Sequence, residues 1–64
     1  MTNEEFRDYL QSKLQALRSI PLAERPSDFL IQEALLTSGV KIMTHGTGQA
    51  RRRFRRDYER RRGL

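Results

Sequence analysis

The chain has 64 residues, no cysteine and a net charge of +5, and its length limits it to one small domain that buries only about 60% of the surface its unfolded form exposes. Without cysteine it has no disulfides or thiolate metal ligands to stabilise so small a fold, so we expect it to form a homo-oligomer or to join a complex. No apolar run approaches the roughly 18 residues of a membrane span, and the first residues do not resemble a secretion leader, so we expect a cytoplasmic protein without membrane contact.

The first predicted element is an amphipathic helix over about residues 3–19. Thr2 and Glu5 have the spacing of a capping box, and Asn3 is the alternative N-cap. Apolar residues then recur at spacings of four, four and three and form one stripe: Phe6, Leu10, Leu14 and Leu17. The helix should end before Pro21, because the residue that precedes a proline disfavours helical backbone.

The second predicted element is a helix over about residues 28–38 that is apolar on most of its circumference, so we expect it to be the most buried part of the molecule. Two prolines make the segment before it a short, stiff connection, in which Ile20 and Leu22 should contact the core. Ser27 is the expected N-cap of this helix, and Gly39 is its expected stop.

Two connecting segments are predicted next. Val40, Ile42 and Met43 alternate with a lysine, and no second strand is visible to pair with them, so we expect an extended connector that covers the core. Residues 44–48 are rich in glycine and threonine, which predicts a flexible stretch with Thr47 as the N-cap of a third helix.

The distribution of charge divides the chain at this point. Residues 1–46 hold five basic and six acidic side chains, a net charge of −1, whereas residues 47–64 hold eight arginines and two acids, a net charge of +6. We therefore predict a helical packing module over 1–46 and a basic, arginine-rich arm over 47–64. Within the arm, residues 48–62 should form a helix with one apolar edge, made of Ala50, Phe54 and Tyr58. The expected fold class is all-α, a small three-helix domain.

The arginines of this predicted helix are the candidate binding residues. Seven of them spread over roughly 200° of its circumference: Arg51, Arg52, Arg53, Arg55, Arg56, Arg60 and Arg62. Such an arc repels itself unless something negative neutralises it, and a guanidinium can hold a phosphate through two parallel hydrogen bonds. We therefore expect a non-enzymatic protein that contacts the phosphates of RNA or DNA. Asp57 and Glu59, three or four residues from several arginines, should help to order the helix.

Other interpretations of the arm stay open. The main alternative is an interaction module, inhibitor or assembly subunit that docks on an acidic protein surface, and lesser ones are a solubilising tail and anionic lipid. Phe54 and Tyr58 either stack on bases or, as is more usual for residues on an apolar edge, dock the helix on its own core or a partner. A helix-turn-helix is disfavoured because about eight residues separate the second and third predicted helices, where three or four are usual.

We expect no catalytic site, metal site or cofactor. His45 is the single histidine, and no cysteine is present to complete a zinc site with it. Gly46 and Gly48 lack the Gly-Lys-Ser/Thr core of a phosphate-binding loop and indicate a hinge beside an N-cap. Acidic residues of the first two helices, such as Asp8 and Glu33, fall at positions predicted to face solvent, so no pair of carboxylates is available for acid–base chemistry.

The run Ala50-Arg51-Arg52-Arg53-Phe54-Arg55-Arg56 resembles the arginine-rich recognition helices of phage antitermination proteins and lentiviral regulatory proteins. The resemblance is one of composition within the basic arm, so it implies a mode of binding and not a family. The length and the arginine content also suit an accessory protein of a phage or mobile element.

Overall fold

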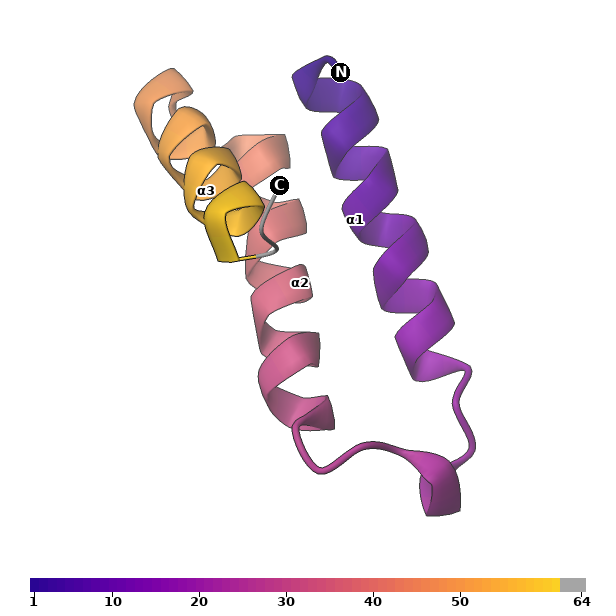
Figure 1. The fold of residues 1–64 in the computed structure, drawn as a ribbon. Coiled ribbons are helices and arrows are strands. Elements are labelled where there is room, and N and C mark those ends of the chain that lie inside the picture. Colours follow the sequence, from indigo (N-terminus) through magenta and orange to yellow (C-terminus); the bar gives the residue numbers. More distant parts are fainter. Residues whose placement is uncertain (62–64) are drawn as a thin grey trace.

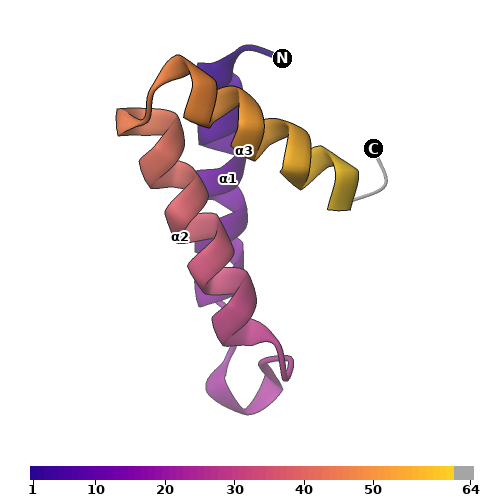
Figure 2. The same cartoon turned by 90° about the vertical axis from the view of Figure 1, so that its left-hand side faces the viewer.

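A computed structural model of the chain describes residues 1–61. The described residues form three α-helices and one short 3-10 helix, with no strand: α1 (Asn3–Arg18), η1 (Leu22–Glu24), α2 (Phe29–His45) and α3 (Gly48–Arg61). This confirms the predicted all-α, three-helix fold. α1 and α2 run antiparallel as a long hairpin, and α3 folds back over the end of that hairpin where α1 begins (Figures 1 and 2).

α1 begins at the predicted capping box. The Thr2 hydroxyl accepts a hydrogen bond from the Glu5 amide at 3.1 Å, and the Glu5 carboxylate accepts one from the Thr2 amide at 3.0 Å. The bond that the carboxylate accepts from the Thr2 amide favours its charged form, so it lowers the pKa of Glu5 below its ordinary value. The helix ends at Arg18, one residue before the predicted end, and its four predicted core residues are all buried.

The core lies between α1 and α2 and is closed at one end by α3. Leu10 at its centre is completely buried. Its members come from all three helices: Phe6, Leu10, Leu14, Leu17, Phe29, Leu36, Met43 and Tyr58. Burial of a large apolar side chain contributes about 1.5 to 3 kcal/mol to folding. Because Tyr58 belongs to this cluster, α3 is packed as part of the fold.

α2 is longer than predicted. It continues through Gly39 to His45, seven residues beyond the predicted end at residue 38. The expected stop at Gly39 and the expected extended connector over Val40, Ile42 and Met43 are therefore both wrong. β-branched residues reduce helix propensity only slightly, and burial of Met43 against α1 at helical spacing from Leu36 outweighs that cost.

Gly39 has a packing role inside α2. A β-carbon at this position would lie 2.5 Å from Cζ of Phe54 and 3.0 Å from Cδ1 of Leu10. The missing side chain therefore lets the Phe54 ring of α3 approach the backbone of α2 closely. A glycine that the sequence suggested as a helix end is thus a contact point between two helices.

The segment between α1 and α2 also differs from the expectation. Ser27 does not cap α2, because Asp28 occupies the cap position, where its carboxylate accepts a hydrogen bond from the Gln32 side chain at 2.7 Å and none from a helix amide. Ile20 packs against the core as predicted, whereas Leu22 is 79% exposed. The short η1 turn keeps Leu22 away from the hairpin.

α2 packs against both α1 and α3, but it is not buried on all sides. Leu30 and Ile31 are 74% and 73% exposed, because α1 and α3 together cover only part of the circumference of α2. The helix was expected to be the most buried part of the molecule, and these two of its apolar residues depart from that expectation. They leave an exposed apolar pair near the start of α2.

The connection between α2 and α3 consists of Gly46 and Thr47, so the predicted flexible stretch over 44–48 is wrong. The Gly46 amide donates to the Ile42 carbonyl at 2.7 Å, and a β-carbon on Gly46 would lie 2.5 Å from the same oxygen. Thr47 is the N-cap of α3 as predicted, since its hydroxyl accepts from the Ala50 amide at 3.1 Å. The wide spacing that disfavoured a helix-turn-helix is therefore absent from the structure.

Candidate nucleic-acid interface

The inner side of α3 is fixed by two aromatic rings. Tyr58 is 3% exposed and meets the Phe6 ring edge to face, with 5.6 Å between the ring centroids. Phe54 is half-buried, stacks on Tyr58 at 6.1 Å and fills the space above Gly39. Both rings therefore dock α3 onto the hairpin, and Tyr58 has too little free surface for a base to stack on. Their docking determines which side of α3 faces outward.

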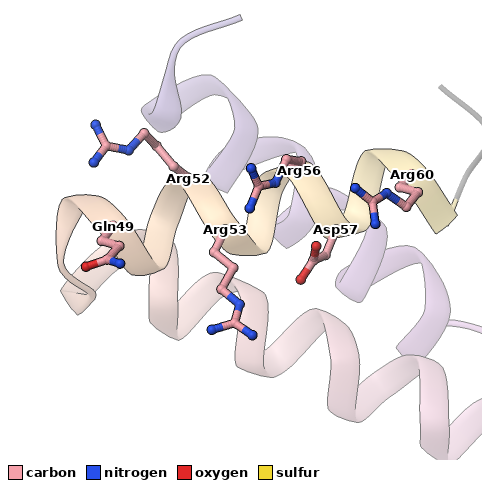
Figure 3. Close-up of a pocket in the computed structure, with 6 residues that line it drawn as sticks. All are labelled: Gln49, Arg52, Arg53, Arg56, Asp57 and Arg60. Atoms are coloured by element: carbon pink, nitrogen blue, oxygen red, sulfur yellow. The ribbon is translucent and has the colours of Figure 1, made fainter.

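The outer side of α3 carries four exposed arginines, which we call the arginine face: Arg52, Arg53, Arg56 and Arg60. They line an open groove together with Gln49 and Asp57 (Figure 3). At about 100° per residue, these positions fall opposite the two docked aromatic rings. Figure 3 shows Arg52 and Arg53 leaving the helix in opposite directions, so the guanidiniums extend across the width of α3 as well as along it.

The four guanidiniums of the arginine face make no ion pair or hydrogen bond with any other group in residues 1–61. Each has five N–H donors and a permanent positive charge. The one acidic side chain in the groove, Asp57, offsets only one of the four charges. The groove is therefore a cationic surface whose hydrogen-bond donors are available to a ligand.

Arg55 differs from the arginine face, although it was predicted from the same run. Its Nε donates to Oε1 of Glu59 at 3.2 Å, and its Nη1 donates to Oδ1 of Asn3 at 3.3 Å. Its guanidinium also lies 5.3 Å from the centroid of the Phe6 ring, within range of a cation–π contact. Arg55 thus ties α3 to the start of α1.

The remaining predicted arginines lie elsewhere. Arg51 is half-buried, and its Nε is buried without a hydrogen-bond partner among the described residues. Arg62 lies outside the described residues. The structure thus brings together four of the seven candidate arginines and separates Arg51 and Arg55 from them.

The two acids of α3 also take different positions. Glu59 pairs with Arg55, four residues away, as the spacing predicted. Asp57 forms no ion pair within residues 1–61 and lies at the edge of the groove (Figure 3). Of the two, only Glu59 makes the within-helix pair that was expected to order α3.

Sequence reasoning missed Gln49 as a groove residue. It is uncharged and stands at the start of α3, so the charge pattern does not mark it. The available signal was its spacing, because positions 49, 56 and 60 share one side of a helix. Gln49 therefore extends the exposed side of α3 to its first turn.

Other candidate sites carry no assembled chemistry. His45 is exposed at the end of α2. Residues 1–61 contain no cluster of three histidine or acidic side chains close enough to hold a metal ion. Asp8 is exposed, and Glu33 accepts a hydrogen bond from Arg18 at 3.1 Å. None of the helices within the described part of the chain has the length and apolar character needed to cross a bilayer.

Comparisons of the chain with known protein families, with curated proteins and with solved structures find no match.

Proposed function

We propose that this protein is a non-enzymatic nucleic-acid-binding protein that contacts phosphates through the arginine face of α3. The observation that carries the proposal is the set of four exposed guanidiniums on one side of a helix whose opposite side is packed into the core. A charge run on a solubilising tail does not need this arrangement, because a tail has no fixed face.

The energetics support a polyanionic ligand. Like charges three or four residues apart on a helix repel one another, so Arg52, Arg56 and Arg60 destabilise α3 in the absence of an anion. A phosphate backbone removes that repulsion and releases its own condensed counterions. Guanidinium groups can also hold phosphate oxygens in pairs, which the ammonium of lysine does less well.

The proposal is tested by replacing the whole arginine face with glutamine and measuring fluorescence anisotropy on labelled 20-nucleotide duplex DNA, single-stranded DNA and RNA. If about four phosphates are neutralised, affinity of the unmodified chain for duplex DNA should fall about 100-fold between 50 and 200 mM salt. The variant should lose this binding while circular dichroism shows unchanged helix content, since these four side chains have no partners in the described structure.

A matched control removes four positive charges from α1 and α2 instead, through glutamine substitutions at Arg7, Lys13, Arg18 and Lys41. Its net charge equals that of the first variant, so a difference in affinity reports where the charge is lost. Circular dichroism checks that loss of the Arg18–Glu33 ion pair leaves the fold of the control intact. The control should keep most of the affinity. Equal loss in both variants would mean that net charge alone drives binding, and the proposal for the arginine face would be wrong.

A second candidate function is favoured by a different observation, the exposed pair Leu30 and Ile31. Adjacent large apolar side chains on the surface of a small domain are typical of contact sites for other proteins. In this function the chain is an interaction module or assembly subunit, and α2 makes the contact. Serine substitutions at both positions would then disrupt its complexes while leaving binding to nucleic acid intact.

A further inference from the structure

The arginine face has a geometry that is more specific than a charged patch. We infer that its ligand is duplex DNA, with α3 lying in the major groove, where Gln49, Arg56 and Arg60 face base edges and Arg52 and Arg53 hold the phosphates on either side. This inference rests on the proposed function and adds the class of nucleic acid and the residues that determine sequence preference.

One α-helix fits the width of one DNA groove. A helix with its side chains is about 10 to 12 Å across, and the major groove of B-form DNA is about 12 Å wide. α3 is packed against the hairpin along one side only, so its outer side is free to enter (Figure 2). From Gln49 to Arg60 the helix rises about 16 Å, which corresponds to about five base pairs.

The side chains of the arginine face form a central row and two flanks around α3. Gln49, Arg56 and Arg60 lie within about 40° of one another, directly opposite the buried rings. Arg52 and Arg53 lie about 100° apart, one on each side of that central row, and Figure 3 shows them pointing in opposite directions. A helix in a groove needs this division, because its central row meets the bases while its flanks meet the two phosphate backbones.

Two residues that line the groove are not arginines. Gln49 adds nothing to phosphate attraction, and Asp57 opposes it. Gln49 has a use against base edges, since glutamine bonds adenine through two contacts. Asp57 lies about 40° beyond Arg53 toward the docked side of α3, so it does not belong to the central row. Arginine in the central row is the usual partner of guanine. The mixture therefore suits base recognition better than a uniform phosphate contact.

Two other nucleic acids fit less well. Single strands bind through aromatic rings on which their bases stack, but Tyr58 is buried and Phe54 is packed above Gly39. A regular RNA duplex has a deep, narrow major groove that protein side chains cannot read. The arginines could contact its wide minor groove, but there the central row could not distinguish one sequence from another.

The test begins with selection of bound sequences from a pool of randomised duplex DNA. We expect a preferred site of about five base pairs. Its affinity should exceed that of a scrambled duplex. Replacing one guanine or adenine of that site by its 7-deaza analogue removes one major-groove acceptor. It should weaken binding about two- to tenfold, because a bidentate base contact contributes about 5- to 150-fold discrimination and loses one of its two hydrogen bonds.

Two single variants separate the central row from the flanks. Gln49→Ala should abolish discrimination at one base pair while keeping affinity for scrambled DNA. Arg53→Gln should weaken binding to all sequences alike and reduce the slope of log affinity against log salt by about one. Both side chains are exposed, so circular dichroism should show the same fold in each variant.

The outcomes distinguish this inference from the proposed function. Duplex DNA binding without any enriched site, without an effect of the 7-deaza bases or without an effect of Gln49→Ala would overturn the major-groove inference and leave phosphate binding standing. Tighter binding to RNA or to single strands than to duplex DNA would also overturn it. Absence of binding to every nucleic acid at low salt would overturn the proposed function itself.

Discussion

Neighbouring arginines in α3 have different surroundings and therefore different expected roles. Arg55 contacts Asn3, Glu59 and the Phe6 ring, whereas the next residue, Arg56, projects from the arginine face into the groove (Figure 3). Identical side chains one position apart thus differ in their contacts, and under the proposed function we expect Arg55 to stabilise the fold and Arg56 to bind the ligand.

Substitution of these two arginines gives a paired prediction. Arg55→Gln should lower the free energy of unfolding by about 1 kcal/mol, from loss of the partly exposed ion pair and the cation–π contact. The melting temperature should fall by about 4 to 8 °C, with DNA affinity nearly unchanged. Arg56→Gln should instead weaken DNA affinity and leave the melting temperature nearly unchanged.

Thermal denaturation and anisotropy on the two single variants check this pair. An equal loss of affinity in both, with no change in melting temperature, would mean that Arg55 belongs to the binding surface.

At the level of single residues, the sequence predicted the core of α1 completely and the arginine face only as part of a larger set. The apolar stripe of α1 could be predicted because its residues recur at the spacing of a helical turn within one helix. The division of the arginines depends on which side of α3 docks, and that is determined by Phe54 above Gly39, a contact between residues of different helices. No pattern within the basic run contains this information.

The helices themselves show where local signals fail. The capping box at Thr2 and the cap at Thr47 were read correctly, because each depends on residues within one turn. The end of α2 was predicted wrongly, because glycine is common both after helices and where two helices approach closely. The sequence alone could not decide between these roles for Gly39.

Substitution of Gly39 by alanine tests whether this glycine serves as a contact point between α2 and α3. Gly39→Ala would gain up to about 1 kcal/mol of intrinsic helix stability, but the new methyl group would collide with Phe54. Overpacking of this kind costs about 1 to 3 kcal/mol, so we expect a net loss of stability. In the background of Phe54→Ala the same substitution should instead be neutral or stabilising.

Chemical denaturation of the four combinations measures the coupling between the two positions. Additive effects would show that Phe54 does not contact this part of α2. A stabilising Gly39→Ala in the otherwise unchanged chain would mean that α3 shifts without cost.

Across the whole molecule, cationic and apolar surfaces occupy different helices. The arginine face belongs to α3, whereas Leu30 and Ile31 are exposed on α2. The nearby exposed residues Ala34, Thr37 and Ser38 carry no charge, and Lys41 lies one turn beyond them on the same side. Two copies of a chain with a net charge of +5 repel each other least where they meet through such an uncharged surface.

We therefore predict that the chain self-associates through α2. Sedimentation velocity should show a concentration-dependent dimer at micromolar concentrations, and Leu30→Glu with Ile31→Glu should leave only monomer. Circular dichroism of this double variant should be unchanged, since both side chains are exposed in the single chain. A monomer at all concentrations without the substitutions would refute self-association and leave a different protein as the partner of this surface.

The two-residue connection of Gly46 and Thr47 has a consequence for the thermodynamics of binding. Because α3 cannot leave α2 without losing Tyr58 from the core, its helix is already formed before any ligand arrives. Arginine-rich segments that fold on contact lose much of their interaction energy to ordering. Here α3 is ordered during folding, so the same number of phosphate contacts should give tighter association than in a segment that folds on binding. Heating through the unfolding transition should therefore abolish binding in one step.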